Sequence, residues 1–157
     1  MTAMTRFLPL VLANLALGLG LAASPPTLAV GDLSQQPPVE VRVQLGDKDN
    51  AMRFTPDRVE LETGRLYKLV LDNQSPQKHY FSSDSLAGAV YTRKVQVLDQ
   101  AGATLVEVKG AIREIEVYPG LRAEWWLVPV KAGTFSDLKC TITGHAERGM
   151  IGTIVIR

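Results

Sequence analysis

The chain has 157 residues, of which 46% are hydrophobic and 21% charged, so it fits one ordinary globular domain and not a disordered or collagen-like protein. Seventeen basic and sixteen acidic residues leave a formal net charge of +1. This balance offers no support for a nucleic-acid partner, and we expect none.

The N-terminal segment has the composition of a secretory signal. Arg6 precedes an apolar run, Phe7 to Ala23, that ends in small residues, and the stretch TLA at 27–29 suits cleavage. We therefore predict a signal peptide over residues 1–29, with an uncleaved membrane anchor as the alternative. The mature chain is then exported to a periplasm, a thylakoid lumen or the extracellular space, and it has no further apolar run long enough to span a bilayer.

Residues 30–38 are rich in proline, glycine and polar side chains, which predicts a linker before a domain at 39–157. Apolar and polar side chains then alternate over Val39–Leu45, the period of a half-buried strand. Further strands are expected at 52–61 (interrupted by Thr55-Pro56), 66–71, 90–98, 104–109, 112–117 and 124–130, with a closing strand after Gly152 and a loop or helical turn at 82–89. About eight short strands separated by turns predict an all-β sandwich or small barrel.

Three finer expectations concern strand placement. The runs 104–109 and 112–117 are candidates for a hairpin, since only a short glycine-containing turn separates them. Pro129 predicts an edge position or a bulge for the run 124–130, because proline cannot donate to a strand ladder. Trp125 and Trp126 point to opposite faces of that strand, so at least one is expected in the core.

The only cysteine of the chain, Cys140, opens a set of evenly spaced donor side chains. His145 and Met150 follow, each after four intervening residues, and His79 ends an upstream polar loop. A lone cysteine in an exported protein is a buried thiol, an intermolecular link or a metal ligand. Taken singly, these residues suit ordinary core or surface positions. Their combination favours a metal site.

A thiolate, two imidazoles and a weak thioether form the donor set of copper in electron-transfer sites. Zinc is the alternative metal, but structural zinc sites use four strong ligands, and thioether binds zinc poorly. The sequence therefore predicts one copper ion per chain, held by His79, Cys140, His145 and Met150. Glu147, between two of these residues, is interpreted as a surface charge.

Two stretches of the chain resemble the cupredoxins, the blue copper family that includes plastocyanin, azurin and auracyanin. In the first, Asn73 at a strand end precedes His79; in the second, the family order is followed by YPG at 118–120, KAGTF at 131–135, Cys140, Gly144-His145 and Gly149-Met150. The resemblance implies a Greek-key β-sandwich of about eight strands with one type 1 copper. His79, Cys140 and His145 would be the in-plane ligands and Met150 the axial ligand.

The resemblance also implies that His145 reaches the surface through an apolar patch. Two positions depart from the family pattern. Tyr80 stands where many members have asparagine directly after the first histidine, and Thr143 stands where many have proline two residues before the second. Because hydrogen bonds near the ligands tune a metal, these positions are expected to influence the redox potential.

The expected function is that of an exported, monomeric one-electron carrier that meets redox partner proteins and is not an enzyme. The alternative is a copper-handling or assembly protein that binds copper without shuttling electrons. An enzymatic alternative is an open copper site that binds small oxidants. One cysteine and two histidines are too few for the dinuclear copper of terminal oxidases or for a multicopper oxidase.

Overall fold

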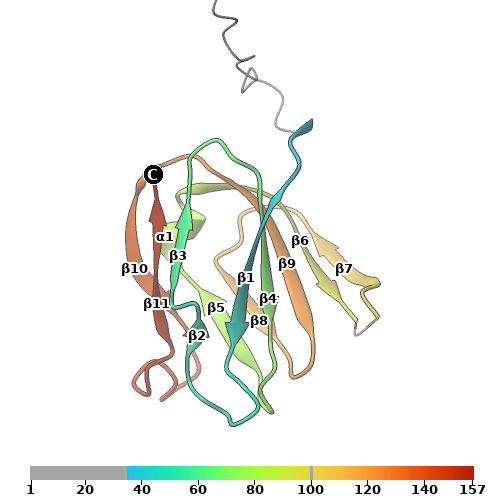
Figure 1. Cartoon of the computed structure of the whole chain (residues 1–157), viewed down its shortest axis with the longest axis vertical. Coiled ribbons are helices and arrows are strands. Elements are labelled where there is room, and N and C mark those ends of the chain that lie inside the picture. Colours follow the sequence, from blue (N-terminus) through green and yellow to red (C-terminus); the bar gives the residue numbers. More distant parts are fainter. Residues whose placement is uncertain (1–34, 100) are drawn as a thin grey trace, which may run out of the picture.

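A computed structural model of the chain describes residues 35–99 and 101–157 (Figure 1). The predicted signal peptide at 1–29 and most of the predicted linker lie outside these residues. The described part contains eleven strands and one four-residue helix, which confirms the all-β prediction. The helix α1 (Asp84–Ala87) falls in the stretch expected to be a loop or helical turn, and no helix in the described part could cross a membrane.

The strands form two sheets, both of which mix parallel and antiparallel pairs. The six-stranded sheet has the order β2 (Phe54–Thr55), β1 (Val39–Leu45), β4 (Tyr67–Asp72), β9 (Arg122–Pro129), β6 (Val90–Leu98) and β7 (Thr104–Val108). The five-stranded sheet has the order β3 (Arg58–Leu61), β11 (Ile151–Ile156), β10 (Gly133–Lys139), β5 (His79–Ser82) and β8 (Glu114–Val117).

The core lies between the two sheets because alternate side chains of their strands point inward. Phe81 of β5 is fully buried and meets the rings of Phe54 and Trp125 edge-on, at centroid distances of 5.7 and 6.5 Å. These two partners belong to the other sheet, so Phe81 joins the layers by aromatic packing. Burial of the inward-pointing side chains between the two sheets holds the five-stranded sheet in place. The predicted ligand residues are held with it.

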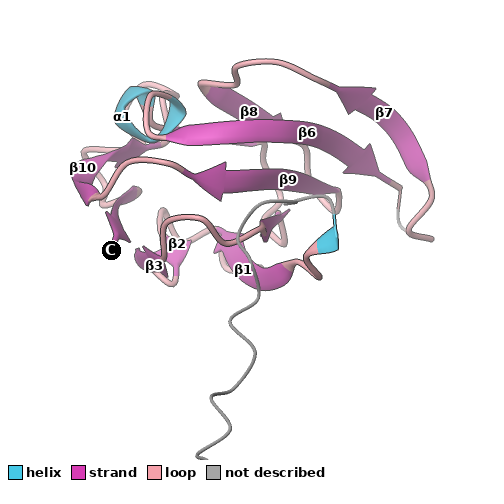
Figure 2. Ribbon diagram, turned by 90° about the horizontal axis from the view of Figure 1, so that it is seen from above, coloured by secondary structure: helices cyan, strands magenta, loops and turns pink. Residues whose placement is uncertain are grey.

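The expected strands at Val39–Leu45 and Val90–Leu98 have the predicted bounds. The expected hairpin between the runs 104–109 and 112–117 is wrong. β7 pairs with β6 in one sheet, whereas β8 pairs with β5 in the other. The short connection at 109–113 therefore runs from one sheet to the other (Figure 2). It leads to β8, the edge strand beside β5 in the five-stranded sheet.

Pro129 predicted an edge position or a bulge for its strand, and the edge position is wrong. The β6–β9 ladder does contain a register irregularity, between Thr92 and Lys94 of β6. β9 lies in the interior of its sheet between β4 and β6, and Pro129 is its last residue. At that end the missing N–H interrupts no inner part of the ladder, and the Pro129 carbonyl accepts a hydrogen bond from Gly64 at 2.9 Å. The expectation for the tryptophans is confirmed, since Trp125 is buried in the core and Trp126 lies beneath Lys94 on the outer face, 5.1 Å from its ammonium group.

Candidate metal centre

Strand pairing brings two of the predicted ligands to one end of the five-stranded sheet. β5 and β10 are antiparallel neighbours, with Ser82 opposite Lys139. His79 is the first residue of β5 and Cys140 comes directly after β10, so they meet at the same end. The loop 140–150 begins and ends there as well, because Ile151 at the start of β11 pairs with Lys139.

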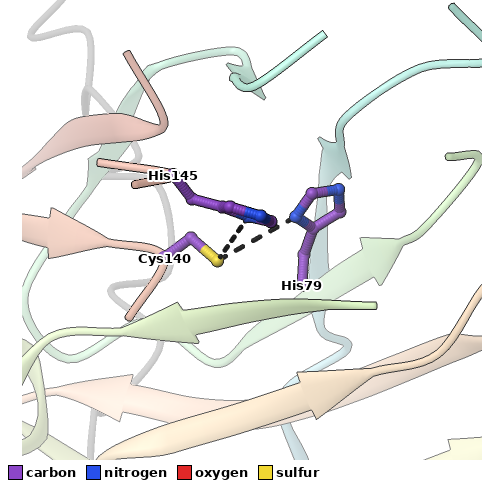
Figure 3. Close-up of side chains that lie close together, drawn as sticks. All are labelled: His79, Cys140 and His145. Atoms are coloured by element: carbon purple, nitrogen blue, oxygen red, sulfur yellow. Dashed lines mark hydrogen bonds between the residues drawn. The ribbon is translucent and has the colours of Figure 1, made fainter. Parts of the chain in front are cut away.

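The side chains of His79, Cys140 and His145 converge in the interior (Figure 3). The Nδ1 atoms of His145 and His79 lie 3.4 and 3.9 Å from the Cys140 sulfur, and the three donor atoms lie within 4.8 Å of one another. An ion in a trigonal plane, with bonds of about 2.0 Å to nitrogen and 2.3 Å to sulfur, would separate N and S by about 3.7 Å. The two observed distances lie on either side of this value, so the donor set fits a metal ion.

The loop 140–150 is a compact turn held by its own main chain. Cys140 N–H donates to the Met150 carbonyl, and Met150 N–H donates to the His145 carbonyl, both at 3.0 Å. Met150 is fully buried in the core. The main chain of Met150 is thus tied to both of the other predicted ligands on this loop.

Comparisons with known proteins bear on the fold. No protein-family model and no curated protein matches the sequence. Among solved structures, auracyanin B is similar with a TM-score of 0.51 and 19% identity, over 81% of this chain and 95% of that chain. Auracyanin A, described as a "blue" copper protein from the green thermophilic photosynthetic bacterium Chloroflexus aurantiacus, has a TM-score of 0.50 and 16% identity, over 77% and 100%. The chain has the cupredoxin fold.

Larger proteins also contain this cupredoxin fold. The copper-containing nitrite reductase from Thermus scotoductus SA-01 matches with a TM-score of 0.55 and 15% identity, over 80% of this chain but only 32% of that chain. At these identities the likeness is one of fold. What the site does has to be argued from its own residues.

In this cupredoxin fold, Asn73 organises the loop that leads to His79. Its side-chain amide donates to the Val117 and Gln77 carbonyls at 2.7 and 2.8 Å, and its side-chain oxygen accepts from the Ser75 amide and hydroxyl at 3.0 and 2.9 Å. Asn73 is fully buried. The sequence indicated Asn73 only as part of the family pattern, because the partners of a buried amide depend on the fold.

The main chain at Tyr80 supplies the cysteine with a hydrogen-bond donor, which does not depend on the side chain at this position. Tyr80 N–H donates to the Cys140 sulfur, with 3.4 Å between nitrogen and sulfur. Thr143, the other departure, is exposed, and its amide makes no hydrogen bond to the sulfur within the described residues. Of the two departures, Tyr80 is therefore the one whose residue contacts the sulfur.

Both imidazoles are held in the neutral form at neutral pH. Burial, reinforced by the nearby His145, lowers the pKa of His79 from 6.5 to about 4. Burial also lowers the pKa of His145, and the charge of Arg148 acts in the same direction. Neutral imidazole is the form that binds metal ions.

One implication of the family resemblance is not met. His145 was expected to reach the surface, but its relative exposure is only 2%. Glu147 is exposed, as expected for a surface charge. Within residues 35–99 and 101–157, no carboxylate or further imidazole joins the three converging donors.

Proposed function

We propose that the chain is a type 1 copper protein that carries single electrons, with His79, Cys140 and His145 as in-plane ligands and Met150 as the axial ligand. The observation that carries this proposal is the convergence of two buried imidazoles on one buried sulfur, at 3.4 and 3.9 Å. When bound, copper supplies a one-electron couple between Cu(I) and Cu(II).

The donor types favour copper over zinc. A structural zinc site usually needs four strong ligands, whereas the described residues bring together three. Met150, buried at the end of the same loop, can add a thioether, which suits copper and is a poor ligand for zinc.

The protein part of the site suits electron transfer because its ligand residues are already in place. His79 and Cys140 are held by neighbouring strands, and His145 by the hydrogen-bonded turn 140–150. These side chains therefore need little movement when the charge of the site changes. Their near-complete burial excludes water and leaves no open position for a substrate, which favours a carrier over an enzyme.

We place this carrier outside the cytoplasm as a monomer that meets redox partner proteins. Export rests on the signal-like sequence of residues 1–29, and the need for partners follows from the proposed chemistry. The nitrite reductase likeness supports no enzymatic proposal, since the chain spans 32% of that protein.

Titration of the purified protein with Cu(II) tests the proposal. We expect an intense visible thiolate-to-copper charge-transfer band, which Cys140→Ser abolishes while Thr141→Ser, at the exposed neighbouring position, retains it. Azide should leave the band unchanged, because a closed site offers it no coordination position. A folded protein that stays colourless and binds no copper would overturn the proposal.

The copper-handling alternative is separated from the carrier by redox cycling. A carrier retains its copper through repeated reduction and oxidation, whereas an assembly protein releases Cu(I) to an acceptor. Measuring bound copper after several cycles in the presence of a Cu(I) chelator distinguishes the two functions.

A further inference from the structure

Gly46, which follows β1 directly, lies against the ring of His79. Its φ is +66°, and a Cβ at this position would stand 2.9 Å from His79 Nε2, 2.9 Å from Ser75 Cβ and 3.2 Å from the Ala51 carbonyl oxygen. A Cβ closer than 3.0 Å to another heavy atom forces something to move. The imidazole thus occupies space that the side chain of any other residue would need.

The contact is on the side of the ring away from the sulfur. His79 directs Nδ1 towards Cys140, and its other ring nitrogen points away (Figure 3). Nε2 is buried and, among the described residues, has no hydrogen-bond partner. In many metal sites the second ring nitrogen donates to an acceptor that fixes the ring. Here the close approach of Gly46 to the ring takes that place.

Gly46 itself has little freedom to retreat from the ring. Its N–H donates to the Arg53 carbonyl at 2.9 Å, and its carbonyl accepts from the Gln44 side-chain amide at 2.9 Å. The loop on the far side is also held, because Asn73 anchors Ser75. A side chain at position 46 would therefore displace the imidazole before it displaced the main chain.

We propose that Gly46 is a positioning residue for His79: the absence of a side chain at position 46 allows the ring to stand where Nδ1 faces the Cys140 sulfur. The expected effect of Gly46 on copper binding rests on the proposed function. The contact between Gly46 and His79 is independent of it. The ring, held between Gly46 on one side and the sulfur on the other, has its orientation set by the shape of the loop after β1.

Two pairs of variants separate the steric effect from backbone strain. Gly46→Asn and Gly46→Ala add a Cβ against the ring, and asparagine tolerates positive φ, as Asn50 does at +63° in the same loop. Gly102→Asn and Gly102→Ala are the matched controls, because Gly102 has a φ of +86° and, among the described residues, no heavy atom within 4 Å of its added Cβ.

In the copper-loaded protein, Gly46→Asn should lower copper affinity by about 10- to 100-fold and shift the charge-transfer band. Gly102→Asn should match the parent. A folded Gly46→Asn variant with parental affinity, band position and intensity would overturn the proposal.

Nuclear magnetic resonance of the metal-free protein tests the same contact without copper. The parent should show a nuclear Overhauser effect between the Gly46 Hα protons and the His79 ring, and Gly46→Asn should shift the ring signals of His79 where Gly102→Asn does not. Absence of this nuclear Overhauser effect in the parent protein would overturn the positioning role of Gly46, even if the variants fail to fold. A parent that shows the contact but binds no copper refutes the proposed function and leaves the positioning role standing.

Discussion

The main-chain N–H of Tyr80 donates a hydrogen bond to the sulfur of Cys140. A donor aimed at a thiolate stabilises negative charge on sulfur, and this favours the reduced, more electron-rich site. Tyr80→Pro removes the donor, so we expect the reduction potential to fall. One hydrogen bond of about 1 kcal/mol corresponds to about 40 mV for a one-electron couple.

Protein-film voltammetry measures that change in potential. Tyr80→Phe is the control, because it alters the side chain and keeps the amide, and it should leave the potential close to that of the parent. Circular dichroism establishes that Tyr80→Pro still folds. A folded Tyr80→Pro variant with the parental potential would show that the hydrogen bond does not tune the site.

Met150→Leu separates a ligand role from a packing role. Leucine has a similar volume, so the free energy of unfolding should fall by less than about 1.5 kcal/mol. Loss of thioether donation destabilises Cu(II) more than Cu(I), and the reduction potential should rise while the charge-transfer band remains. Met52→Leu, outside the proposed ligand set, is the control. If Met150→Leu and Met52→Leu have equal potentials, Met150 is core packing alone.

Asn73→Ala should destabilise the fold because it leaves the Val117 carbonyl and the Ser75 amide without their buried partner. We expect the free energy of unfolding to fall by about 2–4 kcal/mol in urea titrations. Gln74→Ala, which removes an exposed side chain from the next position, should change it by less than about 0.5 kcal/mol. Equal effects of the two substitutions would contradict the anchoring role of Asn73.

The metal-free protein should lose stability as the pH falls from 6.5 to 4. The pKa of His79 is lowered from 6.5 to about 4 in the folded protein, so between these values the unfolded chain binds the additional proton. As the pH falls through this window, the free energy of unfolding therefore decreases by on the order of 3 kcal/mol because of His79, and this loss is complete below pH 4.

Urea titrations of the metal-free protein at pH 7 and pH 4 measure this loss. Other groups also titrate in the window, so His79→Gln is the reference. The variant should lose less stability than the parent over the same interval. Identical losses in the two proteins would mean that His79 does not resist protonation in the fold.

The sequence predicted strand positions better than strand partners. Alternating side chains located Val39–Leu45, because alternation reflects which face of a strand is buried. It carries no information about which strand lies alongside. For this reason the sequence predicts a hairpin between β7 and β8, whereas β8 pairs with β5. Likewise Pro129 predicts an edge position or a bulge, although it lies at the end of an interior strand.

The donor residues were accessible from the sequence because chemistry restricts them to few residue types. Cys140 and His79 are the only cysteine and one of two histidines, so their convergence required no knowledge of the strand order. The sequence did not connect Gly46 with the metal site, since its approach to His79 depends on two loops distant in the chain. The burial of His145 was missed for the same reason.

Cys140 and His79 are 61 positions apart in the chain, and they meet only when β5 and β10 pair. Neither strand alone can assemble both donors. In a bacterial expression screen supplied with copper, the intensity of the blue colour would consequently report how much of the protein is correctly folded. The protein would serve as its own folding reporter, with no fused fluorescent partner.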